Sequence, residues 1–527
     1  MKTILKYLLL TLLVIFLFLA LYLGVQSFRL RWWGTPEIGS LEELTPAQKA
    51  EDMRYLLDLT RQVSQAEAVW QAAGLDNPLD QPELWVDRAR QTASNAEFSD
   101  LILQYLVHVA QGGHAYLAFD AHFNPTISLV SDIPRDAFSK MPLWGNLING
   151  LAWNAHANLD LVYREGKYVL NQAAQVEGIN LPDGAVVEKV DGLSTDDFVL
   201  LQQYRTHLRY DPQAKKFFIY PLLTVDPGFG QPGWEVTFRL PAGEMETVFV
   251  KKIPSYVTHR PDESHVDNIR CLALDEAVLY IKIQTFSYEQ AAHDRTALQQ
   301  CFVNGGFQKV IFDVRGNNGG EIWSYMDNIL APLAREPLTY ESTAAVKESF
   351  YQWYGWRFWL FQTTTSNELS DAPTHIVNVE EISYPPYSDQ GWRVMRITRK
   401  VEPAAEPFPF EGQAYVLTDN NTLSAGDSFA RTMQSTGLAK IVGANTVGWG
   451  QAYQAKMLYG LPNSGILFWM DAELTFNPDG SLNNYVGVIP DVVLNASSYP
   501  TAYPVYISRD VLLSDPWVQW VLEDPSQ

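Results

Sequence analysis

Three short stretches of the sequence carry residue types that suit acyl-transfer chemistry. The first centres on His114, which follows two glycines where an expected helix gives way to an expected strand. An imidazole can take a proton from a serine hydroxyl at neutral pH. A single histidine is more often a structural hydrogen-bonding residue, so this stretch predicts a catalytic base only together with the other two.

The second stretch places Ser424 between an apolar strand and a helix expected over 425–436. A serine at such a turn lies near the N–H groups at the positive end of the helix, which stabilise an alkoxide or an oxyanion. The same position suits a helix N-cap, with Asp427 three residues later as a partner similar to a capping box. Taken alone, the N-cap interpretation is the stronger.

The third stretch is DVRGNNGG at 313–320, which closes another apolar strand. Glycines such as Gly319 and Gly320 let backbone N–H groups turn outward, where they can hold an anion or a developing oxyanion. It is not a phosphate loop, because no Lys-Ser or Lys-Thr follows the glycines. A plain turn explains the stretch equally well.

An α/β core is expected to position these residues. Nearly continuous apolar runs at 278–283 and 310–314 enclose a helical pattern at 293–302, and the theme repeats between 414 and 442. Uninterrupted apolar strands joined by helices are typical of a sheet covered on both faces. We therefore predict a catalytic core over 267–494.

Four further segments complete the predicted organisation. A helical N-terminal region spans 35–159 and carries His114, because apolar residues recur there at helical spacing between prolines. A compact β unit follows at about 160–252, where a strand, a tight turn and a helix start are expected around 184–199. An insertion at about 341–406 interrupts the core, and 495–527 forms a C-terminal tail.

The insertion is rich in aromatic residues, which a solvated loop would not carry at this density. Burial against the core is the favoured explanation, and a substrate-facing lid or a membrane-dipping wedge are the functional alternatives. The residues concerned are Tyr351, Trp353, Tyr354, Trp356, Phe358, Trp359 and Phe361.

The first 30 residues predict a membrane anchor or an export signal. The run from Tyr7 to Val25 is almost entirely apolar and follows two lysines. About 19 residues rising 1.5 Å each just span a hydrocarbon core. Since a small-residue cleavage site is poorly formed, we favour an uncleaved single-pass anchor, with the remaining chain on the outer side of the cell membrane, periplasmic or extracellular.

Composition narrows the function classes. The formal charge of −22 has no compensating basic stripe, so nucleic acid and anionic lipid surfaces are poor partners for the bulk of the protein, and no nucleic-acid partner is predicted. The two cysteines, Cys271 and Cys301, are too few for a thiolate metal cluster. A disulfide between them and two separate core thiols are equally compatible with the sequence. No metal or organic cofactor is implied.

In order along the chain, these motifs resemble a known family. They are GGHAYL at 112–117, DVRGNNGG at 313–320, SAGD at 424–427, IVGANTVG at 441–448 and GVIPD at 487–491. Over about 101–494 the chain resembles the serine peptidases that include carboxy-terminal processing proteases and the tricorn core protease. The resemblance implies a ClpP/crotonase-like catalytic core, and the β unit resembles the PDZ module that many relatives carry.

The resemblance also implies roles for individual residues. Ser424 matches the nucleophile, His114 matches the base of the tricorn-like branch, and the N–H groups of Ala425 and of Gly319 or Gly320 match the oxyanion hole. Trp449 occupies the place of the lysine that the processing-protease branch uses.

One feature of the family is missing at its usual place. Where relatives carry an orienting glutamate, this sequence offers Asn483 and Asn484. Asn484 is therefore a candidate orienting residue. Its amide cannot stabilise an imidazolium by charge, so either the Ser-His pair reacts more slowly or a carboxylate comes from elsewhere in the chain.

The sequence thus predicts a membrane-anchored, extracytoplasmic serine endopeptidase that cleaves extended or unfolded polypeptides. Two alternatives stay open. One is a protein of the same fold that has lost catalysis and binds peptides or apolar ligands, which the replacements at Trp449 and Asn484 favour. The other is an esterase acting on non-peptide substrates with the same residues.

Overall fold

The computed structural model describes residues 39–118, 133–134, 136–149, 155–223, 232–254, 267–287, 289–303, 305–352, 375–452, 456–494 and 508–525. The predicted anchor and most of the aromatic stretch of the insertion lie outside these ranges. Within them, no helix combines the length and the apolar character needed to cross a bilayer.

A six-stranded sheet forms the centre of the predicted core. Its order is β14 (Ile269–Ala273), β15 (Val278–Ile283), β16 (Lys309–Asp313), β20 (Gln413–Thr418), β21 (Ala439–Gly443) and β25 (Val492–Val493). All neighbours are parallel except β14 and β15. The apolar strands predicted at 278–283, 310–314 and 414–417 are confirmed to within one residue.

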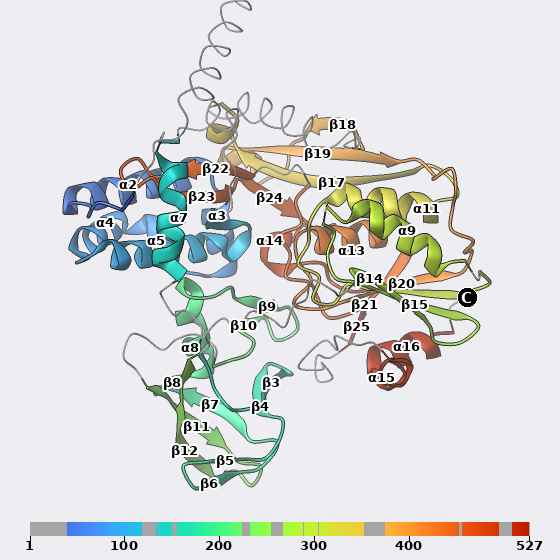
Figure 1. Cartoon of the computed structure of the whole chain (residues 1–527), viewed down its shortest axis with the longest axis horizontal. Coiled ribbons are helices and arrows are strands. Elements are labelled where there is room, and N and C mark those ends of the chain that lie inside the picture. The colour runs from blue at the N-terminus through green and yellow to red at the C-terminus, as the bar shows by residue number, and fades with distance from the viewer. Residues whose placement is uncertain are drawn as a thin grey trace, which may run out of the picture.

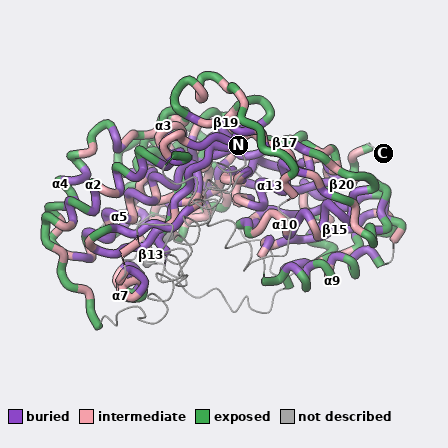
Figure 2. The backbone as a smooth tube through the Cα atoms, turned by 90° about the horizontal axis from the view of Figure 1, so that it is seen from above, coloured by how far each residue is buried: buried purple, intermediate pink, exposed green. Residues whose placement is uncertain are grey.

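Helices cover both faces of this sheet (Figure 1). One face packs against α9 (Ala291–Cys301), α13 (Ala425–Ser435) and the α10 (Ile322–Tyr325) to α11 (Ala331–Leu333) segment. The other face is covered by α15 (Arg509–Ser514) and α16 (Pro516–Glu523), through residues such as Trp517 and Val521. In Figure 2 the strands β15 and β20 are largely buried, whereas α9 carries exposed residues along its outer side. The mixed α/β class is confirmed, and the C-terminal helices are part of the core packing.

A second sheet contains much of the predicted insertion. It consists of β18 (Ile376–Glu381), β19 (Trp392–Val401), β17 (Leu338–Lys347) and β24 (Glu473–Phe476), all antiparallel. Ala345 and Val394 on β17 and β19 are buried and pack with Leu474 on β24. The described part of the insertion is therefore joined to the core by a long sheet rather than by a loop.

The N-terminal helices pack against a third, three-stranded sheet. The helices are α2 (Pro46–Val63), α3 (Ala66–Ala73), α4 (Pro82–Gln91), α5 (Asn95–Val109) and α7 (Ala137–Asn149). The sheet has the order β1 (Ala115–Leu117), β23 (Leu467–Asp471), β22 (Lys456–Gly460). One hydrophobic cluster joins both, including Leu56, Ile102, Phe468 and Met470. Strand β1 thus ties the helical region to a part of the chain more than 340 residues away.

A compact β unit lies apart from these layers, at the bottom of Figure 1. Its sheet has the order β12 (Met245–Lys251), β11 (Gly233–Arg239), β7 (Val186–Val190), β4 (Lys167–Leu170), β3 (Leu161–Arg164), with β8 (Leu193–Ser194) beside β7. Helix α8 (Thr195–Leu201) packs against this sheet. Together they enclose a hydrophobic cluster whose buried residues all come from the β unit and include Trp234 and Phe238. The strand, the Asp191–Gly192 turn and the helix start predicted here are confirmed, with both turn residues at positive φ.

A buried charge network ties the C-terminal helices to the strand that precedes the glycine loop. Arg315 pairs with Asp313 and, at 2.7 Å, with Asp515 at the start of α16. Burial opposes ionisation of Asp313, but Arg315 and Lys282 together hold its pKa below the ordinary value. The network keeps the base of the glycine loop fixed relative to the sheet.

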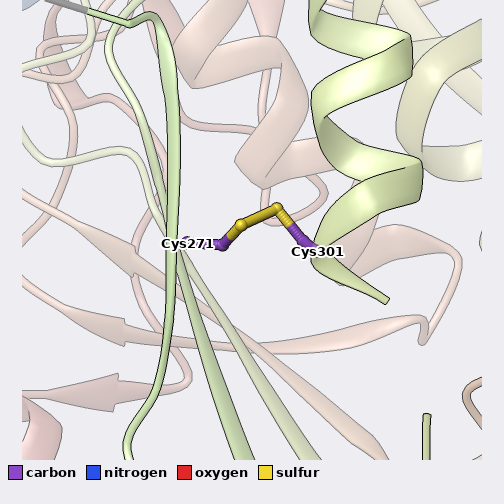
Figure 3. Close-up of a disulfide and its surroundings, with 2 residues drawn as sticks. All are labelled: Cys271 and Cys301. Atoms are coloured by element: carbon purple, nitrogen blue, oxygen red, sulfur yellow. A yellow bond between two sulfur atoms is a disulfide. The ribbon is translucent and has the colours of Figure 1, made fainter. Parts of the chain in front are cut away.

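Cys271 and Cys301 form a disulfide between β14 and the end of α9 (Figure 3). The structure therefore favours the paired arrangement of the two that the sequence left open. The bond lies on the side of the sheet that α9 covers.

Replacing both cysteines by alanine should lower the free energy of unfolding by about 3 kcal/mol, because the bridge closes a loop of about 30 residues in the unfolded chain. Urea unfolding of the oxidised wild type and of Cys271→Ala/Cys301→Ala measures the difference. A reducing agent should lower the wild-type midpoint and leave the variant unchanged. Equal midpoints without reductant would show that the bridge does not form.

Candidate active site

The pairing of β1 with β23 brings His114 beside Asp471. Their register places Ala115 opposite Met470, and the Asp471 N–H donates to the His114 carbonyl at 2.9 Å. The Asp471 carboxylate in turn accepts a hydrogen bond from the His114 backbone N–H. Hydrogen bonds to its backbone thus fix His114 in the sheet, independently of the contacts of its side chain.

The three side chains Ser424, His114 and Asp471 form a continuous hydrogen-bonded chain. His114 Nδ1 lies 2.8 Å from Asp471 Oδ2, and His114 Nε2 lies 3.1 Å from Ser424 Oγ. The Asp471 side chain is 2% exposed and that of His114 is 15% exposed. A buried carboxylate on Nδ1 fixes the tautomer that leaves Nε2 free to accept the serine proton. This is the arrangement of a serine nucleophile, a base and an orienting carboxylate.

Gly113 makes the close approach of the carboxylate possible. A Cβ at this position would lie 2.8 Å from Asp471 Oδ2 and 2.3 Å from the Gln65 amide nitrogen. Both distances are below normal van der Waals contact, so a side chain would displace one of these groups. The glycine before the histidine is explained by this crowding.

Ser424 is held at the tip of a strained strand-to-helix turn. It has φ 56° and ψ −122°, a backbone conformation that a non-glycine residue rarely adopts without support. The support comes from two neighbouring loops: the Ser424 N–H donates to Gly448 O at 3.0 Å, and the Leu423 N–H donates to Asn317 O at 3.0 Å. These bonds hold the Ser424 hydroxyl at the start of α13, where it points toward His114.

The N-cap interpretation of Ser424 does not hold. Its side chain makes no capping hydrogen bond to α13. Asp427 does not reach back to the turn either: its carboxylate is buried and accepts hydrogen bonds from Thr446 Oγ1 at 2.5 Å and from the Val488 N–H at 3.2 Å. Burial raises the pKa of the Asp427 carboxyl. Through these bonds Asp427 links the first turn of α13 to the segments around Thr446 and Val488.

Backbone amides of the glycine loop and of α13 meet next to the serine. A Cβ on Gly319 would lie 2.9 Å from Ser424 Oγ and 3.0 Å from the Ala425 nitrogen, so only glycine allows the loop to come this near. The Gly319 N–H already donates to Asn317 Oδ1 at 2.8 Å. Among the described residues, no hydrogen bond engages the N–H groups of Gly320 and Ala425. These two amides are the better candidates for an oxyanion hole.

Asn484 lies near the site without touching the imidazole. Its amide nitrogen donates to Gly112 O at 2.7 Å and to Glu473 O at 3.0 Å, and its oxygen accepts from the Thr475 N–H at 2.8 Å. It therefore fixes the backbone two residues before the histidine. The orienting role for which the sequence made Asn484 a candidate is filled by Asp471, the carboxylate that contacts His114 Nδ1.

Asp471 is the functional residue that the sequence analysis missed. It ends an apolar run at 466–470, as Asp313 ends another, and a carboxylate at the end of an apolar strand was the available signal. Trp449, predicted to stand where a lysine would, has its ring centroid 5.6 Å from that of His114. It forms an apolar wall beside the imidazole.

The fold and this geometry define a class of protein, a serine hydrolase with a histidine base and a buried carboxylate. Residues 277–494 match the model of Peptidase family S41. This match confirms the family that the motifs predicted and the predicted class of enzyme, a serine peptidase. No curated protein matches the sequence.

The chain is similar to several solved structures. A crystal structure of a CPAF mutant is 14% identical, covering 92% of this chain and 99% of its own, with a TM-score of 0.52. The photosystem II D1 C-terminal processing protease is 14% identical over 87% of this chain and 96% of its own (TM-score 0.36). The tricorn protease is 13% identical over 85% of this chain and 34% of its own (TM-score 0.33). The likeness to the CPAF mutant extends the shared fold beyond the family match, to most of the chain.

Proposed function

We propose that the protein is a membrane-anchored, extracytoplasmic endopeptidase that cleaves extended or unfolded polypeptides with Ser424, His114 and Asp471. The observation that carries the proposal is the hydrogen-bonded chain from Asp471 through His114 to Ser424 Oγ at 3.1 Å. The family match over 277–494 supports a peptide bond as the target.

The geometry supports the following course. His114 Nε2 accepts the Ser424 proton as the oxygen attacks the peptide carbonyl, and Asp471 stabilises the imidazolium that forms. The N–H groups of Gly320 and Ala425 stabilise the tetrahedral oxyanion. His114 then gives its proton to the leaving amine. In the second half of the reaction the imidazole takes a proton from a water molecule that attacks the acyl-enzyme, and it returns this proton to Ser424 Oγ as the bond between Ser424 and the acyl group breaks.

The architecture around the site supports this substrate class. A core of the ClpP/crotonase type with a PDZ-like β unit suits a polypeptide that is bound in extended form, since an extended chain can add to the edge of a sheet. The β unit has its own hydrophobic cluster, and its β9 (Arg209–Asp211) is joined to the core through Asn445, whose amide donates to Tyr210 O at 3.0 Å. Such a unit can hold one part of a chain while another part is cleaved.

Two observations support the location. The apolar run from Tyr7 to Val25 has the length of a single membrane span. The disulfide between Cys271 and Cys301 is of the kind that persists in oxidising compartments outside the cytoplasm. Together they favour an anchored protein whose catalytic part faces outward.

The function is tested with the purified full chain and an unfolded, reduced and alkylated protein. The wild type should cleave it at internal bonds, and the same protein in its native folded form should be cleaved much more slowly. Tight binding of the unfolded protein without cleavage would favour instead a binding protein that has lost catalysis. Hydrolysis of small esters with no cleavage of any polypeptide would favour an esterase.

A further inference from the structure

The sheet that carries His114 continues as an open surface beside the site. Side chains alternate between the two faces of a strand, so His114 and Tyr116 on β1 share a face with Trp469 and Asp471 on β23. Lys456 on β22 pairs directly with Asp471 and points to the same side. His114, Asp471 and Lys456 thus form one row across three strands, and Tyr116 and Trp469 begin the next row.

The rest of this sheet is covered. The opposite face is buried in the helical region's hydrophobic cluster, through Ala115, Leu117, Met457, Tyr459, Phe468 and Met470. At the far end of the open face, Leu458 and Leu467 pack with Phe138 of α7. Tyr116 by contrast is 42% exposed. Among the described residues, the least covered part of this face is therefore the end that carries Tyr116, next to the candidate active site.

The ammonium group of Lys456 lies over the aromatic pair on this surface. Lys456 Nζ lies 5.6 Å from the centroid of the Tyr116 ring and 5.4 Å from that of Trp469, and it donates to Tyr116 Oη at 3.3 Å. Ring faces attract a cation but do not neutralise it. The rings hold the ammonium group in place on the surface.

The described residues place no carboxylate within ion-pair distance of the ammonium group. Within the described part of the chain, Lys456 forms no ion pair within 4.0 Å, although the chain has an excess of 22 negative charges. Lys456 affects the pKa of a carboxyl group, that of Glu321, which comes directly after the glycine loop. Burial raises the pKa of Glu321, and Lys456 opposes that rise without cancelling it.

We propose that Lys456, Tyr116 and Trp469 form a substrate subsite that binds an acidic side chain of the polypeptide being cleaved. The proposal rests on the proposed peptidase function and adds a specificity to it. The charge of Lys456 attracts the carboxylate, and the two rings contact its apolar stem. Lys456 lies two strands from His114, about 10 Å at a strand spacing of about 4.8 Å. An extended peptide rises about 3.3 Å per residue, so the acidic residue lies about three residues from the cleaved bond.

The test is a charge swap on the full chain. Peptides released from an unfolded protein are sequenced by mass spectrometry for the wild type, Lys456→Glu and Lys456→Arg. The wild type and Lys456→Arg should favour bonds with Asp or Glu about three residues away, and Lys456→Glu should lose this preference about tenfold and gain one for Lys or Arg. Arg54→Glu, a change of equal charge at an exposed position of α2, should cleave as the wild type does. An unchanged acidic preference in Lys456→Glu would overturn the subsite.

A binding measurement separates this proposal from the proposed function. Fluorescently labelled acidic and basic peptides of equal length are titrated onto Ser424→Ala protein with and without Lys456→Glu. Acidic peptides should bind about tenfold more weakly to the charge-swapped protein and basic peptides more tightly, with unchanged thermal unfolding. This result with no cleavage by the wild type would refute the peptidase and keep the subsite. Equal binding of both peptides by both proteins would refute the subsite whatever the wild type cleaves.

Discussion

Replacing Asp471 by asparagine should reduce kcat for an unfolded protein substrate by about 10⁴-fold while the protein stays folded. The amide matches the carboxylate in shape, but it can donate a hydrogen bond to His114 Nδ1 and so favours the tautomer with its proton on Nε2. That nitrogen then cannot accept the Ser424 proton across the 3.1 Å that separates them. The loss corresponds to about 5.5 kcal/mol of transition-state stabilisation.

Initial rates at saturating substrate measure this effect. KM should change little, because Asp471 is buried and does not contact the substrate. Asp510→Asn removes an equal charge from an exposed position in the first turn of α15 and should keep the wild-type rate. Near-wild-type activity in Asp471→Asn would show that the carboxylate does not orient the base. Loss of activity together with a large fall in thermal stability would be answered by Asp471→Glu, which should recover part of the rate if the charge is what matters.

Ser424→Ala and His114→Ala should each remove about 10⁴- to 10⁶-fold of the activity, and the double variant should be no slower than the slower single variant. Serine and histidine act as a unit, so removing either leaves the other without a function in the reaction. The measurement is the release of new amino termini from the unfolded substrate over hours.

Ser428→Ala is the matched control for these variants. Ser428 lies one turn further along α13, is buried, and has no hydrogen-bond partner for its hydroxyl among the described residues. Its alanine variant should therefore retain activity. Multiplicative losses in the Ser424→Ala/His114→Ala double variant would show that the two side chains act separately.

The fold was largely predictable because the core strands are local signals. Nearly continuous apolar runs at 278–283 and 414–417 need no distant information, since strands buried on both faces are apolar at almost every position. The helix after Ser424 was equally clear. The sheet in the predicted insertion was missed because it depends on distant pairings. Strand β17 pairs with β19 on one side and, on the other, with β24, more than 100 residues further on.

The site was predictable in part for the same reason. Ser424 and the glycine loop lie at ends of adjacent strands of one sheet, where chemistry-bearing residues gather. Asp471 was not recognised because its place depends on the pairing of β1 with β23, across 357 residues of sequence. Asn484 stands where the family carries its orienting glutamate, so the sequence made it the candidate orienting residue. In the structure its amide donates instead to the backbone carbonyl of Gly112.

The central claim is that His114 activates the Ser424 hydroxyl, and covalent labelling tests it most directly. A fluorophosphonate probe reacts with serine hydroxyls that an adjacent base deprotonates. After incubation and digestion, peptide mapping of the wild type should find the label on Ser424, and the labelling rate should fall by at least about 10³-fold in His114→Ala. Labelling of Ser424 at the same rate in His114→Ala, or no label on Ser424 in folded wild-type protein, would contradict the account.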